Sequence, residues 1–184
     1  MARQISGKFP LIIGGQFTPH IASTIFNLLD KQELTKSRSV SSTWKDVVDS
    51  RTTLWNDPEL YREAAIEGNL EMCKMMIEKA DNKNPTLKYG GLTPLHIAPG
   101  SGYTDIFRLI FENVQDKNPP DSYGDTPLHL AARRYKVEIC RLILAHVHDK
   151  QPLNNQGKTP LDKAREELRT DEELQVLEQL WLED

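Results

Sequence analysis

Cysteine and histidine are the residue types in this chain that could supply a nucleophile or bind a metal ion. Cys73 has no histidine or asparagine placed as a partner, and Cys73 and Cys140 form no Cys-x-x-Cys pair, so neither a reactive thiol, a disulfide scaffold nor a zinc site is indicated. His146 and His148 lie near a predicted helix end, where histidine interacts well with the helix dipole. Phosphate loops, nucleophile elbows and paired carboxylates are missing from the sequence. We therefore predict no catalytic residue, no cofactor and no metal site.

Two other histidines, His96 and His129, belong to an internal repeat. Each stands fourth in a Thr-Pro-Leu-His segment, at Thr93 and Thr126, and Thr-Pro-Leu-Asp follows at Thr159, so the anchors lie 33 residues apart. Matching glycines and alanines surround the anchors at Gly91, Gly124 and Gly157 and at Ala98, Ala131 and Ala164. A fixed period with several matched residue types is typical of stacked repeats. We interpret both histidines as structural.

Each residue of the anchor has a physical role in beginning a helix. Threonine supplies an N-cap hydroxyl, and proline occupies the first helical position without losing a hydrogen bond. Glycine fits the preceding tight turn, where a positive φ is needed. Histidine can use both ring nitrogens to bridge the threonine and the backbone of a neighbouring repeat. The small alanine lets the two helices of a repeat approach closely.

A second amphipathic helix is predicted after each anchor. Apolar residues recur at spacings of three and four in Val137–Leu144 and Asp105–Phe111, which places them on one face. An earlier repeat lacks the anchor but keeps Leu70–Ile77, in which Cys73 aligns with Cys140. We interpret that position as a slot in the core.

The last predicted helix begins at a capping box, Thr170-x-x-Glu173, and covers Asp171–Leu182. Together these patterns predict four repeats over residues 58–184. The outer two serve as caps, because a terminal repeat needs one polar side.

The repeats resemble the ankyrin repeat, most closely in residues 124–132, Gly-Asp-Thr-Pro-Leu-His-Leu-Ala-Ala. The resemblance implies an all-α solenoid of about four helix pairs with hairpin-like loops. Three departures are expected to reshape it locally. Pro99 should shorten the first helix of its repeat, Tyr135 stands where glycine usually makes the turn between helices, and one extra residue lengthens the tip at 89–91.

Ankyrin-like architecture implies that a protein partner binds at the loop tips and on the exposed faces of the first helices. The residues expected there, which we predict to bind a target protein, are Lys88, Tyr89, Leu92, Ser122, Tyr123, Asp125, Arg133, Arg134, Asn155, Gln156 and Lys158. Tyrosine and arginine often dominate protein interfaces. The alternative is that these are ordinary exposed residues, because single surface tyrosines are common.

Three short helices are predicted ahead of the repeats, over residues 17–55. Thr18 and Pro19 begin the first, and Asp30-x-x-Glu33 is a capping box for the second. Three such helices bury little surface, so the segment is expected to need a partner.

Residues 17–55 resemble the F-box. The matching residues are Ile25-Phe26-x-Leu28-Leu29, Glu33-Leu34, Arg38-x-Val40-Ser41, Trp44 and Leu54-Trp55. The start departs from the family, because Phe17 replaces leucine, Pro19 comes one residue late and His20 stands where glutamate is common. The resemblance implies docking of a Skp-family adaptor, which binds a cullin, on an apolar surface and small core built from Phe17, Pro19, Ile21, Ile25, Leu28, Leu34, Val40 and Trp44.

The two resemblances together imply a protein-binding adaptor, in one interpretation the substrate receptor of an SCF-type ubiquitin ligase. The expected division is a tail at 1–16, an F-box-like domain at 17–57 and ankyrin repeats at 58–184. An alternative is an ankyrin scaffold or inhibitor whose amino-terminal helices only cap the solenoid. An enzyme is the least favoured interpretation, because no polar cluster converges in the sequence.

Composition and charge limit the classes of partner that the chain is expected to bind. The chain has 38% hydrophobic and 27% charged residues, which is ordinary for a folded protein. Residues 58–184 carry 22 acidic and 16 basic side chains, which argues against nucleic acid as the main partner. Apolar stretches fall far short of the roughly 18 residues that span a bilayer, and no signal-peptide core follows the start. We expect no membrane partner and a cytoplasmic or nuclear location.

Overall fold

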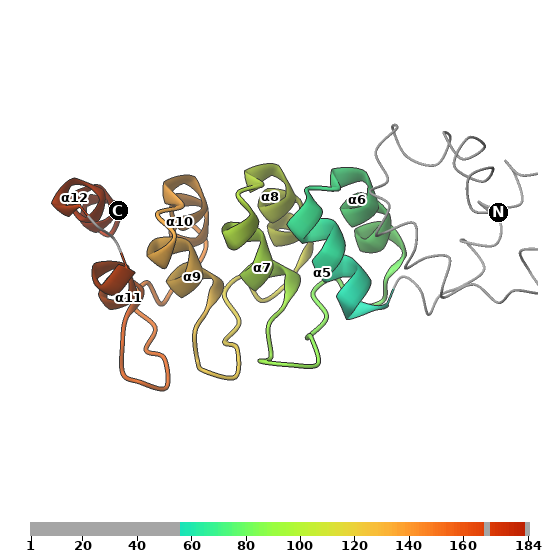
Figure 1. The fold of residues 1–184 in the computed structure, drawn as a ribbon, viewed down its shortest axis with the longest axis horizontal. Coiled ribbons are helices and arrows are strands. Elements are labelled where there is room, and N and C mark those ends of the chain that lie inside the picture. The colour runs from blue at the N-terminus through green and yellow to red at the C-terminus, as the bar shows by residue number, and fades with distance from the viewer. Residues whose placement is uncertain (1–55, 168–169, 183–184) are drawn as a thin grey trace, which may run out of the picture.

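The computed structural model describes residues 56–167 and 170–182. These residues form no strand and eight helices: α5 (Pro58–Glu67), α6 (Leu70–Lys79), α7 (Pro94–Ser101), α8 (Thr104–Asn113), α9 (Pro127–Arg133), α10 (Val137–Leu144), α11 (Pro160–Glu167) and α12 (Asp171–Leu180). They stand as four pairs along one axis, and loops project to one side between successive pairs (Figure 1). The predicted all-α solenoid is confirmed. The predicted tail at 1–16 and all but the end of the segment 17–57 lie outside the described residues.

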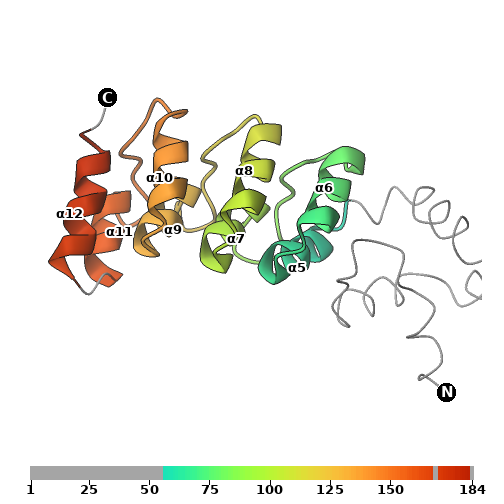
Figure 2. The ribbon, with the colours of Figure 1, turned by 90° about the horizontal axis from the view of Figure 1, so that it is seen from above.

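The pairs stack so that their helices form two rows (Figure 2). The inner row contains α5, α7, α9 and α11, each packed against the next, and the outer row contains α6, α8, α10 and α12 in the same order. A proline begins every inner helix, at Pro58, Pro94, Pro127 and Pro160. Proline fits this position because the backbone N–H that it lacks would have no acceptor within the helix.

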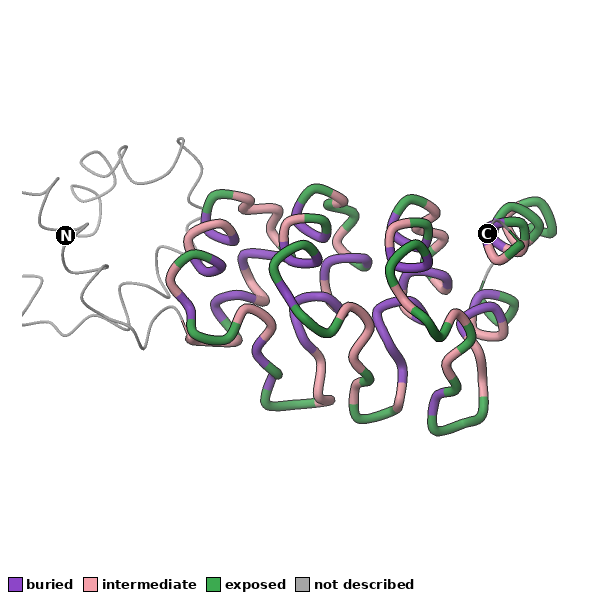
Figure 3. The backbone as a smooth tube through the Cα atoms, turned by 180° about the vertical axis from the view of Figure 1, so that it is seen from behind, coloured by how far each residue is buried: buried purple, intermediate pink, exposed green. Residues whose placement is uncertain are grey.

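A continuous core runs between the two rows. The predicted core slot is confirmed, since Cys73, Phe107 and Cys140 on successive outer helices are fully buried, as are Ala98, Ala131 and Ala164 on the inner helices. Figure 3 shows buried backbone inside the helix pairs and exposed backbone at the loop tips. Burying a side chain the size of Phe107 contributes about 1.5–3 kcal/mol. Each pair buries this surface only because its neighbours cover it.

Pro99 does not shorten its helix, so that prediction was wrong. α7 has eight residues, whereas α9, which lacks an internal proline, has seven. Pro99 is buried like the preceding Ala98, and its missing N–H removes a single bond of the helix. The helix ends instead at Ser101, and the capping residue Gly102 has a left-handed φ of 82°.

Tyr135 takes over the role of glycine in the turn between α9 and α10. Its φ is 52°, against 75° at Gly68 and 82° at Gly102 in the equivalent turns. A left-handed tyrosine is strained, and the packing of its side chain against the core holds it in place.

The last helix begins as predicted, since the Thr170 hydroxyl accepts the backbone N–H of Glu173 at 3.3 Å. It ends at Leu180 rather than Leu182. Within the described ranges, no helix combines the length and apolar character needed to cross a membrane.

Candidate protein-binding surface

Three loops project beside the inner row, and each ends in a tip closed by a backbone hydrogen bond. The closing bonds join Leu87 N to Leu92 O at 2.7 Å, Asp121 N to Asp125 O at 2.9 Å, and Asn154 N to Lys158 O at 3.0 Å. The first closure spans one more residue than the others, which confirms the predicted longer tip. Gly91, Gly124 and Gly157 have φ of 64°, 75° and 72°, so the predicted positive φ is also confirmed.

Neighbouring tips are hydrogen bonded to one another. Ser122 N–H donates to Gly90 O, and Asn155 N–H donates to Tyr123 O, both at 3.0 Å. The Asn155 side chain adds a bond from Nδ2 to Ser122 O at 3.1 Å. The tips therefore form one connected surface instead of three independent loops.

His96 and His129 tie each inner helix to the next tip, as predicted. Nδ1 of His96 accepts the Thr93 backbone N–H at 3.1 Å and lies 2.9 Å from the Thr93 hydroxyl. Its Nε2 donates to Asp125 O at 3.2 Å, and Nε2 of His129 donates to Lys158 O at 3.1 Å. The partners assign the proton to Nε2, because a carbonyl can only accept.

Both histidine rings are neutral in this arrangement. Burial lowers the pKa of His96 and of His129, and this outweighs the nearby carbonyl and carboxylate groups that favour protonation. A second proton on Nδ1 would face the threonine N–H donor. Both nitrogens of each ring are bonded to backbone groups, which is a structural role.

Asp162 replaces this histidine in the fourth repeat. Its Oδ2 accepts from the Thr159 backbone N–H at 2.9 Å and from the hydroxyl at 2.8 Å. These hydrogen bonds lower the pKa of Asp162. Aspartate thus keeps the bond to threonine but lacks the second nitrogen that reaches a following tip.

Asp125 departs from its predicted role as an exposed contact. Only 7% of the residue is exposed. Its Oδ1 accepts from Asn154 Nδ2 at 2.6 Å, and its Oδ2 lies 3.4 Å from Lys163 Nζ. The side chain turns inward because two partners from the next repeat surround it, so Asp125 supports the tips and is not available to a partner protein.

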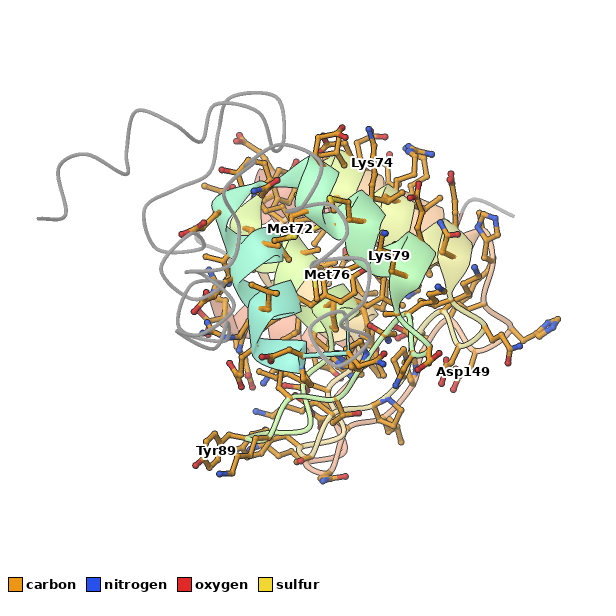
Figure 4. All side chains as sticks on the ribbon, turned by 90° about the vertical axis from the view of Figure 1, so that its right-hand side faces the viewer. Met72, Lys74, Met76, Lys79, Tyr89 and Asp149 are labelled. Atoms are coloured by element: carbon orange, nitrogen blue, oxygen red, sulfur yellow. The ribbon has the colours of Figure 1, made fainter. Side chains whose placement is uncertain are left out.

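The other predicted target-binding residues on the tips divide by exposure. Tyr89 and Tyr123 are 75% and 69% exposed, and the Lys88 ammonium lies 5.4 Å from the centre of the Tyr89 ring. Figure 4, which looks along the stack, places Tyr89 at the far end of the projecting loops, away from Lys74 on the outer row. Ser122, Asn155 and Gln156 are exposed, whereas Leu92 and Lys158 are partly buried. Lys158 pairs with Glu166.

Arg133 and Arg134 lie at the opposite end of α9 from the tips. Arg133 is the last helical residue and is partly buried, and Arg134 follows it and is exposed. The structure therefore brings the tip residues together in one connected row and places the two arginines along the neighbouring helix.

The cysteine thiols and the His146 ring, which could in principle react or bind a metal, lie in surroundings that fit a structural role. Burial raises the pKa of the Cys73 and Cys140 thiols to about 12, so neither is a thiolate near neutral pH. His146 Nδ1 lies 2.8 Å from Leu142 O near the end of α10. No group of three or more histidine, cysteine or acidic side chains converges as a metal site in the part of the chain that the structure describes.

The predicted adaptor-binding residues, Phe17, Pro19, Ile21, Ile25, Leu28, Leu34, Val40 and Trp44, lie outside the described residues. Sequence reasoning did not select Ile66 and Tyr103, which are 44% and 40% exposed beside the inner row. Alignment of the repeats would have found Ile66, because it precedes the turn glycine as Arg133 precedes Tyr135.

Comparison with known proteins agrees with this geometry. The family described as ankyrin repeats (3 copies) matches residues 45–121 and 102–180. A search of curated proteins finds no match. Ankyrin repeats are protein-binding modules, and the two matches together span most of the sequence. The chain belongs to the ankyrin-repeat family.

Proposed function

We propose that this protein is the substrate receptor of an SCF-type ubiquitin ligase. Residues 17–55 dock a Skp-family adaptor, which binds a cullin, and the tips and inner helices hold a target protein. The chain performs no chemistry itself. It raises the effective concentration of the target near the ubiquitin-charged enzyme, in the cytoplasm or the nucleus.

The observation that carries this proposal is the order of residues ahead of the repeats. Ile25, Val40 and Trp44 follow the spacing of an F-box within a segment too small to bury a large core. Such a segment gains stability by covering its apolar residues with a partner. Its position directly before a repeat array is the arrangement expected of a receptor that joins an adaptor to a target.

The connected tips support the second half of the proposal. Tyr89 and Tyr123 are large, exposed side chains on backbone that is fixed by hydrogen bonds between Ser122 and Gly90 and between Asn155 and Tyr123. A surface that is already ordered loses less conformational entropy on binding. Tyrosine also supplies large contact area at low entropic cost.

A second function is favoured by one specific observation. The first family match begins at residue 45, inside the segment 17–57 that resembles an F-box. If residues 45–57 belong to the repeat array, the amino-terminal helices cap the solenoid, and the protein is an ankyrin scaffold or inhibitor.

Co-purification with a Skp-family adaptor separates the two functions. The full chain, a variant that lacks residues 1–55 and a Val40→Asp variant are each co-expressed with the tagged adaptor. Val176→Asp is the matched control, because Val176 is 43% exposed on α12 and lies far from the segment in sequence. Circular dichroism checks that each variant keeps its helices.

The receptor proposal expects a stable complex for the full chain and for Val176→Asp, and loss of the complex for the truncation and for Val40→Asp. No complex with the folded full chain would reject the receptor and favour the scaffold. Equal loss with Val176→Asp would show that a charge anywhere disturbs the assay, and adaptor docking at Val40 would be rejected.

A further inference from the structure

The end of each inner helix presents two neighbouring residues just before the chain turns to the outer row. The pairs in chain order are Ile66–Glu67, Gly100–Ser101, Arg133–Arg134 and Glu166–Glu167. Because α5, α7, α9 and α11 pack side by side (Figure 1), the pairs also lie side by side. We call this set the helix-end row.

The two arginines are the unsatisfied charges at the centre of the row. Among the described residues, neither the Arg133 nor the Arg134 side chain has a hydrogen bond or an ion pair. On the neighbouring fourth repeat Lys158 pairs with Glu166, Lys163 with Asp125 and Arg165 with Glu178. The Lys136 ammonium adds positive charge beside the row, since it lies 3.9 Å from where a Cβ on Gly102 would stand. Two adjacent guanidinium groups without an internal partner favour an external anion.

The place next to the arginines, on α7, is occupied by the small residues Gly100 and Ser101. Gly100 is exposed, and a Cβ built on it would meet nothing within 4 Å. Beyond it lie Ile66, 44% exposed, and Tyr103, 40% exposed, whose ring covers Gly68. The helix-end row therefore has an apolar shelf at Gly100 on one side of the arginine pair.

We propose that the helix-end row binds an acidic segment of a target protein. Carboxylates of the segment pair with Arg133 and Arg134, and an apolar side chain of the same segment rests on the shelf beside Gly100. Glu167 on the other side of the arginines repels a longer acidic run, which sets the direction of the segment across the row. This inference rests on the target-binding half of the proposed function and does not depend on adaptor docking.

The spacing of the helices gives the spacing of the recognised residues. Neighbouring packed helices lie about 8–10 Å apart, and an extended chain advances about 3.3 Å per residue. An acidic residue over Arg133 and an apolar residue over Gly100 are therefore separated by about three positions in an extended segment.

A selection with the full chain as bait tests the inference. A displayed library of random twelve-residue peptides is enriched on the immobilised protein, and the recovered peptides are measured by fluorescence anisotropy. The variants are Arg133→Glu and Arg134→Glu. Arg108→Glu is the matched control, because Arg108 is exposed on the outer helix α8 and the substitution makes the same change in net charge. Thermal unfolding checks that each variant remains folded.

The expected peptides carry aspartate or glutamate about three residues from a large apolar residue. Their affinity falls about tenfold or more in either test variant, changes little in Arg108→Glu, and weakens as salt rises. A peptide whose acidic residue is changed to lysine should bind the Arg134→Glu variant more tightly than it binds the original protein.

Three results would overturn the inference. The first is a selection that enriches no acidic peptides, including one that enriches nothing. The second is an equal loss of affinity in Arg108→Glu, and the third is binding of a single-stranded oligonucleotide in preference to the acidic peptides through the same arginines. Adaptor co-purification is unaffected by all three, so failure here is distinguishable from failure of the receptor proposal.

Discussion

At the scale of single residues, Tyr61 places a polar hydroxyl in the apolar core. It lies on α5 at the position that Leu95, Leu128 and Leu161 fill in the later repeats. The residue is fully buried, and its hydroxyl has no hydrogen-bond partner among residues 56–167 and 170–182. Burial raises the pKa of the phenol above its ordinary value, so the group is a neutral donor that loses its bonds to water on folding.

Tyr61→Phe is expected to stabilise the protein by about 1 kcal/mol, because it removes an unsatisfied buried hydroxyl and keeps the ring. Urea unfolding followed by circular dichroism gives the free energy of unfolding. Tyr103→Phe is the control, since Tyr103 is 40% exposed and its hydroxyl can bond to water. A stability decrease in Tyr61→Phe would mean that the hydroxyl has a partner.

Acidification is expected to destabilise the repeats through His96 and His129. Their folded-state pKa is lowered by burial, so the unfolded chain binds protons more readily than the folded chain does. Their contribution to stability is complete above the unfolded pKa of about 6.5 and is lost as pH falls through the lower folded-state pKa. Urea unfolding at a series of pH values from neutral to mildly acidic measures the loss.

The control for this pH dependence is the double variant His96→Gln, His129→Gln. It is expected to be less stable at neutral pH and to lose less stability on acidification, because two of the groups that take up protons on unfolding are removed. An unchanged pH profile in the double variant would assign the dependence to other groups.

The roles of these residues were predictable from the sequence to different degrees. The histidine bridge follows from the anchor motif, because the period fixes which backbone lies opposite the ring. The burial of Asp125 does not, because its partners Asn154 and Lys163 belong to the next repeat. Periodicity gives positions along the stack but not which polar side chain turns inward.

At the scale of elements, the tip glycines differ in what surrounds them. A Cβ on Gly124 would lie 2.7 Å from the Asn155 backbone nitrogen, whereas one on Gly157 would meet nothing within 4 Å. Their φ values are similar, at 75° and 72°. Alanine substitutions at Gly157 and Gly124 therefore distinguish two free-energy costs: that of a left-handed backbone alone, and that of pushing two neighbouring tips apart.

Gly157→Ala is expected to cost about 1 kcal/mol from backbone strain alone, and Gly124→Ala about 3 kcal/mol, because the added methyl also pushes the neighbouring tip away. Chemical unfolding of both variants measures the difference. Equal losses would indicate that the contact between tips relaxes without cost.

Helix bounds were the part of each element that the sequence predicted least well. The starts were marked by Thr-Pro and by the capping box at Thr170, whereas the ends were not. Pro99 was expected to stop α7, but its burial in the core outweighs one lost hydrogen bond. Tyr135 shows the same balance, since packing against the core keeps a tyrosine in a glycine conformation.

At the scale of the whole molecule, the repeats are expected to unfold independently of the first sixty residues. Trp44→Ala should leave the cooperative thermal transition of the repeats unchanged, because the stack draws its stability from contacts between neighbouring pairs. Circular dichroism of the full chain, the variant and a fragment beginning at Asn56 tests this. A broadened or lowered transition in both altered chains would extend the array toward residue 45, where the family match begins.

The histidine bridges are distributed unevenly over the three junctions between the repeats. Bridges from His96 and His129 connect the second repeat to the third and the third to the fourth. At the equivalent place in the first repeat, Arg62 pairs instead with Glu59 of its own helix. Tension along the solenoid is therefore resisted in two ways. The second and third junctions add a buried histidine hydrogen bond to their packing, whereas the first junction is held by the packing of α5 against α7 and of α6 against α8.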